Sequence, residues 1–179
     1  MPLLNPLTID DFERLPDALA LNHELVDGEL VDVSGNTLNH NRLRDCFISL
    51  LRQYVKKNGL GEIVSEQEFN FEGNAHGPDV AFYAPDKISL CEPTRRVQLF
   101  IPDLAIEIVS KKDTFERLVK KANRYRKCGT KEALIIDLDS RTAFVYSEAR
   151  NAILDENGIF ESSLIPGFSI PIGDVFNQL

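Results

Sequence analysis

Three residues in different parts of the chain could together act on a phosphate ester: Asp79, Glu107 and Lys121. Asp79 opens the apolar segment 79–83, and Glu107 lies inside the apolar segment 104–110. Both faces of both segments are largely apolar, which is typical of central strands, where packing alone would select Val or Ile. A buried carboxylate needs a cation, a proton or strong hydrogen-bond donors. Two carboxylates on neighbouring strands could therefore share Mg²⁺ or Mn²⁺. In the alternative interpretation, each caps a helix or pairs with a surface lysine.

Lys121 belongs to a segment of unusual charge. Residues 111–131 contain nine Lys or Arg against two acidic residues, a net charge of +7, which leaves −15 on the rest of the chain. On a helical wheel Lys121 lies about 40° from Tyr125, at the border of the apolar stripe, whereas Lys120 points to solvent. An ammonium there could orient a water molecule or stabilise phosphate charge. In the alternative, Lys121 extends along the surface to solvent, as lysines at helix borders commonly do.

The elements that must position these residues follow from periodicity and turn signals. Thr8 and Asp11 resemble a capping box and predict a short helix ending near Pro16. A helix is expected over 37–57, stopped by Asn58-Gly59, and a basic helix with Asp113 at its N-cap, stopped by Gly129. Strands are expected over 23–31 (a hairpin), 63–71, 79–83, 104–110, 133–137 and 142–146, before a C-terminal stretch of loop and short edge strands. This order predicts an α/β (α+β) fold with helices packed on a sheet.

Length and composition predict one domain over residues 1–179. The chain is 43% hydrophobic and 27% charged, as in ordinary globular proteins. No apolar run is long enough to cross a membrane and the N-terminus does not resemble a signal peptide. Three dispersed cysteines form no zinc spacing. We therefore expect a cytoplasmic protein, and the net charge of −8 argues against indiscriminate nucleic-acid binding.

Several segments, taken in order, resemble one known family. They are 23–30 (HELVDGEL), 77–80 (GPDV), 106–110 (IEIVS), 121–129 (KANRYRKCG) and 164–168 (LIPGF). Together they look like the Uma-two family of restriction-endonuclease-like proteins, within the PD-(D/E)XK nuclease superfamily. The resemblance covers nearly the whole chain. It implies a restriction-endonuclease-like core, a central mixed β-sheet flanked by helices, here with an N-terminal helix and β-hairpin.

The resemblance also implies roles for particular residues. Asp79 and Glu107 would bind the metal, and Lys121 would be the catalytic lysine. Glu24 is a candidate accessory ligand; alternatively, it pairs with a surface Lys or Arg. His40 stands where the family carries a helical histidine, and could contact phosphate or a water molecule beside the metal.

Two features depart from the usual superfamily pattern. The usual motif places a lysine two residues after the glutamate, where this chain has Val109. Lys121 on the following helix takes that place, with Lys111 and Lys112 as fallbacks. Asp103, in another Pro-Asp dipeptide, is a rival metal ligand.

These observations leave three hypotheses about function. The first is a Mg²⁺-dependent endonuclease acting on DNA, with the Ile108 backbone carbonyl completing the metal shell. In it, nucleic acid contacts His40, Lys120, Arg124 and Lys127, and two copies form a homodimer because one small domain covers few base pairs. The second is a nuclease-fold module that binds nucleic acid or protein with little cleavage. The third is a hydrolase for smaller phosphoesters, which would not need so long a basic helix.

Overall fold

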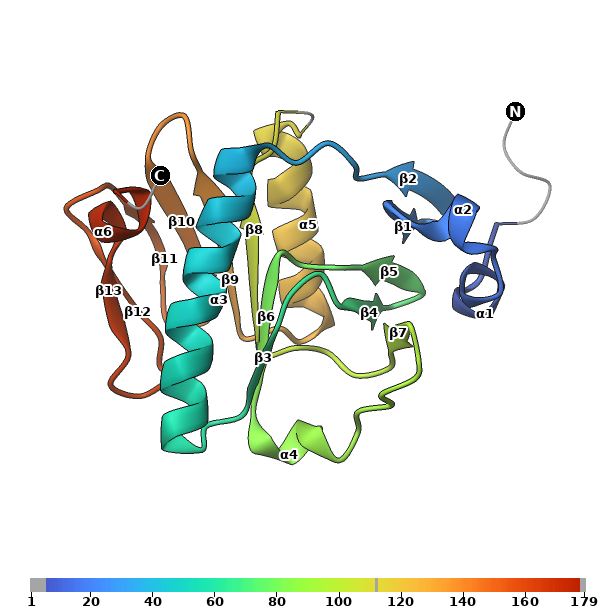
Figure 1. The fold of residues 1–179 in the computed structure, drawn as a ribbon, viewed down its shortest axis with the longest axis horizontal. Helices are drawn as coiled ribbons and strands as arrows, with labels where there is room; N and C mark the ends of the chain where they lie inside the picture. Colours follow the sequence, from blue (N-terminus) through green and yellow to red (C-terminus); the bar gives the residue numbers. More distant parts are fainter. Residues whose placement is uncertain (1–5, 112, 178–179) are drawn as a thin grey trace.

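The computed structural model describes residues 6–111 and 113–177, and its centre is a six-stranded mixed sheet (Figure 1). Its strand order is β11-β10-β9-β8-β6-β3, with β8 and β9 parallel and the other pairs antiparallel. The strands are β3 (Glu62–Val64), β6 (Val80–Tyr83), β8 (Leu104–Ile108), β9 (Glu132–Asp137), β10 (Thr142–Ser147) and β11 (Asn151–Leu154). The predicted central mixed sheet is confirmed.

Two long helices cover opposite faces of this sheet (Figure 1). Helix α3 (Leu38–Asn58) packs on the face formed by alternate residues such as Val80 and Ile106. Helix α5 (Phe115–Cys128) packs on the other face, where Ala133 and Ile135 meet its apolar stripe. Asp79 and Glu107 share the alternation of this second face, so their side chains lie on the side of the basic helix.

A second sheet extends from the core on the N-terminal side (Figure 1). Its order is β2-β1-β5-β4-β7, and helices α1 (Ile9–Glu13) and α2 (Asp17–Ala20) accompany it. The strands are β1 (His23–Val26), β2 (Glu29–Asp32), β4 (Glu68–Phe71), β5 (Asn74–His76) and β7 (Val97–Gln98). The predicted Asp-Gly hairpin joins β1 to β2, with both turn residues at positive φ. The chain runs from β5 of this sheet through Asp79 into β6 of the central sheet. The second sheet is therefore connected to the central sheet directly beside Asp79.

The C-terminal stretch is more regular than the sequence indicated. Strands β12 (Ile159–Glu161) and β13 (Ser169–Pro171) pair with each other, and helix α6 (Ile172–Phe176) follows. Their apolar residues join the core on the α3 side, which explains the order of this Pro- and Gly-containing segment. A short helix, α4 (Pro85–Ile88), which was also not predicted, follows β6.

Helix ends largely follow the sequence signals. The capping box of Thr8 and Asp11 is present, and the left-handed Gly59 ends α3. The predicted N-cap of α5 was wrong by one residue: Thr114 accepts the hydrogen bond of the Arg117 amide. Asp113 accepts instead from the Ser110 hydroxyl at 2.7 Å, because its side chain turns back to the preceding loop. Among the described helices, none combines the length and apolar character needed to cross a membrane.

Candidate active site

Asp79 and Glu107 lie side by side on adjacent strands. Val80 pairs with Ile106 in the antiparallel β6–β8 ladder, which places the residues before and after them, Asp79 and Glu107, next to each other. Both are buried, at 8% and 5% exposure. The Ile108 amide donates to Asp79 Oδ2 at 2.7 Å, in place of a backbone ladder bond. The carboxylates therefore lie where the two strands separate, rather than on the surface.

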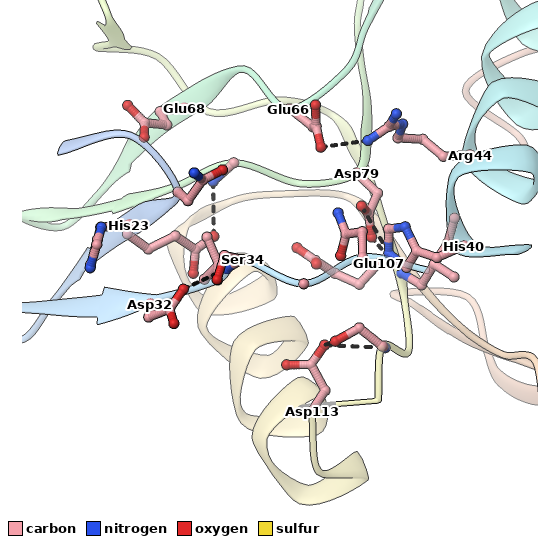
Figure 2. A pocket seen from close by; sticks show the side chains of 18 of the residues that line it. His23, Asp32, Ser34, His40, Arg44, Glu66, Glu68, Asp79, Glu107 and Asp113 are labelled. Carbon is pink, nitrogen blue, oxygen red and sulfur yellow. Dashed lines mark hydrogen bonds and ion pairs between the residues drawn. The ribbon is translucent and has the colours of Figure 1, made fainter. Parts of the chain in front are cut away.

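A cavity of about 790 Å³ opens over these carboxylates (Figure 2). Of the residues predicted from sequence to act in the site, those that line it are Glu24, His40, Asp79, Glu107, Ile108 and Lys121. The described residues of the lining are acidic overall, with eight Asp or Glu side chains against five Arg or Lys. The cavity therefore combines the proposed catalytic groups with an excess of negative charge.

Lys121 joins the two sheets at the floor of the site. Its Nζ lies 2.8 Å from Glu24 Oε1 and 2.9 Å from Glu107 Oε1, and its side chain is 11% exposed. Burial lowers the pKa of this ammonium, but Glu107 and Glu24 outweigh burial and raise it above its ordinary value. The expected approach of Lys121 to the carboxylates is thus observed, and the lysine carries a positive charge.

The local packing explains why a helix supplies the lysine. Glu107 and Val109 follow each other on the α5 face of the strand. Val109 packs there against the apolar cluster to which α5 contributes Leu118 and Ala122, so an apolar side chain fills the position of the usual in-strand lysine. Lys121 immediately precedes Ala122, and its side chain reaches the Glu107 carboxylate from the helix.

Glu107 has a strongly shifted protonation equilibrium. Burial raises the pKa of this carboxyl to about 7, with Asp79 and Glu24 adding like-charge repulsion and Lys121 opposing it. The Tyr125 hydroxyl donates to Glu107 Oε1 at 2.6 Å. Glu24 and Glu107 therefore share one ammonium, with the Asp79 carboxylate beside Glu107, and this cluster has a surplus of negative charge.

Two histidines contact the other carboxylates. His40 Nε2 lies 3.3 Å from Asp79 Oδ1 (Figure 2), and His76 Nδ1 lies 3.0 Å from Glu24 Oε2. Burial lowers the pKa of His76, whereas Asp79 outweighs burial and raises that of His40. His40 is only 2% exposed, and its nearest partner is Asp79 rather than solvent. Its contact with phosphate stays a prediction.

The basic residues predicted to contact nucleic acid lie outside the described lining of the cavity. Lys120 is 75% exposed and pairs with Glu116 one turn away. Arg124 donates to both oxygens of Asp27 at 3.0 Å, and Lys127 is exposed. Lys120 and Lys127 belong to the outer surface of α5, whereas Arg124 is 28% exposed and faces the β1–β2 hairpin. Any role of these residues in binding therefore concerns parts of α5 outside the described lining of the cavity.

The rival metal ligand, Asp103, is a structural residue. It pairs with Lys87 and Lys131 at 2.8 and 2.9 Å, away from the cavity lining. Of the fallback lysines, Lys111 is exposed and is not among the described residues that line the cavity. Lys112 lies outside the described residues. Among the described candidate lysines, Lys121 is therefore the one that the geometry favours.

Sequence reasoning missed two contributors to the site. Tyr125 belongs to the apolar stripe of the helix and is fully buried, but its hydroxyl also donates to Glu107. His76 was not singled out, although it stands three residues before Asp79 and is 3% exposed. The signal in the sequence that could have drawn attention to His76 was its position beside the Gly77-Pro78-Asp79 segment. Its partner in the structure, Glu24, is distant in sequence.

The donor set suits a cation that keeps water ligands. Within residues 6–111 and 113–177, no three His, Cys, Asp or Glu side chains converge to hold a metal by themselves. Asp79 and Glu107 supply two carboxylates. Because the amide and carbonyl of one strand residue face the same side, the Ile108 carbonyl faces the side of Asp79. Mg²⁺ is usually bound by few protein oxygens, and water molecules complete its coordination shell.

Comparisons with known proteins support the architecture. The chain is similar to a solved structure described as "a putative nuclease belonging to DUF820" from Anabaena variabilis, with 23% identity and a TM-score of 0.85 over 97% of this chain and 99% of that chain. A structure described as a DrdV–DNA complex matches at 17% identity over 78% of this chain and 11% of that chain; its TM-score of 0.42 is too low to inform the fold. No match was found among curated proteins.

The fold is therefore that of a restriction-endonuclease-like protein, with two carboxylates on neighbouring strands of its central sheet. Residues 9–173 match the model of the Uma2 family, described as "Putative restriction endonuclease". The chain belongs to this family, and the resemblance noted from its motifs is confirmed.

Proposed function

We propose that this protein is a metal-dependent endonuclease that hydrolyses phosphodiester bonds in DNA. The observation that carries the proposal is the cluster at the cavity floor: the paired carboxylates of Asp79 and Glu107 with the Lys121 ammonium beside them. Membership of a family described as restriction endonucleases supports this class of reaction. A structural protein would gain little from a buried surplus of negative charge that opens to a cavity.

Asp79, Glu107 and the Ile108 carbonyl would hold Mg²⁺, with Mn²⁺ as a substitute. Such a metal neutralises phosphate charge and lowers the pKa of water, which makes a nucleophile available near neutral pH. The chain's own groups organise the remainder. Lys121 is held as a cation, so it donates hydrogen bonds to water or phosphate rather than accepting a proton. His40 contacts Asp79 and restrains that carboxylate.

The outer surface of α5 would bind the DNA backbone. Lys120, Arg124 and Lys127 lie on the positively charged segment of an otherwise acidic chain. Contacts of this kind position the duplex without reading bases.

Because one small domain spans few base pairs, we also propose a homodimer for double-strand cleavage. Sedimentation equilibrium at micromolar concentration tests this, and a monomer with and without DNA would contradict it.

The second candidate is a nuclease-fold module that binds nucleic acid or protein without cleaving. The acidic lining of the cavity favours it, since negative walls repel a polyanion. If the protein is such a binding module, substitution of Asp79 would leave its measured binding activity unchanged. Removing basic side chains from α5 would weaken binding and its salt dependence.

Plasmid cleavage separates the two candidates. Purified protein is incubated with supercoiled plasmid in Mg²⁺, in Mn²⁺ and in EDTA, beside Asp79→Asn and Glu107→Gln. The matched control is Asp103→Asn, which removes a buried carboxylate at the other end of β8 and outside the cavity lining. We expect nicking or linearisation by wild type and control only, and only with metal. Equal cleavage by the Asp79 and Glu107 variants would refute the assignment, and no cleavage by any protein would favour the binding module.

A further inference from the structure

Glu24 reaches the site from the second sheet, whereas Asp79 and Glu107 belong to the central one. Its carboxylate already has three donors. Oε1 lies 2.8 Å from Lys121 Nζ and accepts from the Gly77 amide at 3.0 Å, and Oε2 lies 3.0 Å from His76 Nδ1. The side chain is 5% exposed. Few of its lone pairs remain for a metal ion.

Lys121 needs a second anchor to occupy one position. A lysine ammonium lies at the end of a flexible four-carbon stem, and one carboxylate does not fix its direction. Glu107 contacts Nζ from the central sheet and Glu24 contacts it from the N-terminal sheet, so two carboxylate oxygens on different sheets hold the ammonium.

The surroundings hold Glu24 itself in place. The His76 ring contacts Tyr125 and Phe71, with centroids 5.7 and 5.9 Å apart, so its Nδ1 has little freedom to turn. A second ion pair, Asp27–Arg124, joins the same hairpin to the same helix three residues further along each. The N-terminal sheet is therefore fastened to α5 beside the proposed catalytic lysine.

We propose that Glu24 is a positioning residue for Lys121 rather than a metal ligand, and that the N-terminal sheet serves the site through this contact. The proposal rests on the proposed function for its catalytic meaning. Its geometric content is independent: Glu24 fixes the ammonium against the Glu107 carboxylate. Misplacement of a catalytic group by about 1 Å can slow a reaction about 100-fold.

The first test observes the ammonium directly, without metal. In protein labelled with ¹⁵N-lysine, a protected Lys121 ammonium gives a side-chain ¹H–¹⁵N signal, assigned by its loss in Lys121→Arg. We expect the signal in wild type and its loss in Glu24→Gln. Glu24→Asp keeps the charge but is one methylene shorter, and should also lose the signal, which guards against misfolding of the Gln variant.

The matched control is Glu13→Gln. Glu13 also belongs to the N-terminal part and also accepts three hydrogen bonds, two from Arg95 and one from the Val97 amide. It lies outside the described lining of the cavity. A purely structural role for Glu24 predicts equal effects of the two substitutions on the Lys121 signal, once thermal denaturation shows that both variants are folded.

The second test measures cleavage and metal binding in the same variants. We expect Glu24→Gln to lower kcat about 100-fold with KM for DNA and Mn²⁺ affinity by calorimetry little changed. A tenfold or greater loss of Mn²⁺ affinity with the ammonium signal retained would make Glu24 a metal ligand and overturn the proposal. Persistence of the signal with wild-type kcat would also overturn it. If wild type does not cleave, the proposed function fails, while the spectroscopic comparison still decides whether Glu24 holds Lys121.

Discussion

The two ends of strand β8 each have a buried acid, and their surroundings differ. Asp103, just before the strand, faces two lysines and accepts from the Ala84 amide at 2.9 Å. Burial raises its pKa, but Lys87, the Ala84 amide and Lys131 outweigh burial and hold the pKa below 3.8. Glu107, near the other end, shares one ammonium with Glu24 and faces Asp79, and its pKa rises to about 7.

This difference separates a structural acid from a functional one. At Asp103 two lysine ammonium groups contact one carboxylate, so its negative charge is fully compensated. The carboxylate is also shielded from solvent. At Glu107 two carboxylates share one ammonium, Asp79 adds a third negative charge beside them, and the group opens to a cavity. Burial of an acid alone therefore does not identify a site; an uncompensated negative charge with access for a cation does.

The largest effect on stability is expected from Lys121→Met, which leaves Glu24 and Glu107 buried without their cation. Breaking a buried ion pair by removing one partner costs about 3–5 kcal/mol. Denaturant titration at pH 7.5 measures the free energy of unfolding. The double variant Lys121→Met/Glu107→Gln should recover part of the loss, and a single variant as stable as wild type would show that Glu24 and Glu107 do not depend on the Lys121 cation.

A smaller loss in the free energy of unfolding, about 1–3 kcal/mol, is expected from Asp103→Asn. The two lysines left without their carboxylate can still reach solvent. The folded-state pKa of Asp103 lies below its ordinary 3.8. Its stabilisation is therefore present above pH 3.8 and is lost as the pH falls through the lower folded-state value. Denaturant titrations between pH 7 and pH 3 should show the deficit shrinking under acid. A deficit that does not change with pH would place its origin elsewhere.

The opposite sign is expected from Glu107→Gln in EDTA. The pKa of Glu107 is raised from 4.5 to about 7, so its contribution is present below pH 4.5 and is lost as the pH rises through 7. The Gln variant does not ionise. Its melting temperature should therefore rise relative to wild type between pH 5 and pH 8, measured by scanning calorimetry. A variant that becomes relatively less stable over that range would show that the ionised Glu107 is well compensated.

The smallest effect on folding is expected from Lys120→Ala, because Lys120 and Glu116 are exposed. The melting temperature should stay unchanged. If α5 contacts phosphates, DNA affinity should fall at every sequence, and the slope of log affinity against log salt should decrease by about 1. Fluorescence anisotropy with two unrelated duplexes measures both. Exposed Lys56 of α3 provides the control, since it lies on the opposite face, and an equal effect of Lys56→Ala would remove α5 as the binding surface.

The sequence predicted the central sheet and both long helices, because apolar runs, helical periodicity and capping residues are local signals. It raised neighbouring strands for Asp79 and Glu107 only as a possibility, and the β6–β8 ladder supplies that pairing. Lys121 could be found because one helix follows the Glu107 strand closely. The links of Glu24 to Lys121 and His76 could not be derived, since 97 and 52 positions separate these pairs in the sequence. The C-terminal helix was missed because its order comes from packing on α3 rather than from its own residues.

The most direct test of the account compares divalent-cation binding at the two ends of β8. Titration calorimetry with Mn²⁺ at pH 7.5 would be performed on wild type, Asp79→Asn, Glu107→Gln and Asp103→Asn, each checked for folding by circular dichroism. We expect one Mn²⁺ site per chain in wild type and Asp103→Asn, and loss of binding in the other two variants. Equal Mn²⁺ binding in all four proteins, or none in wild type, would contradict the claim that the surplus charge at Asp79 and Glu107 forms a metal site.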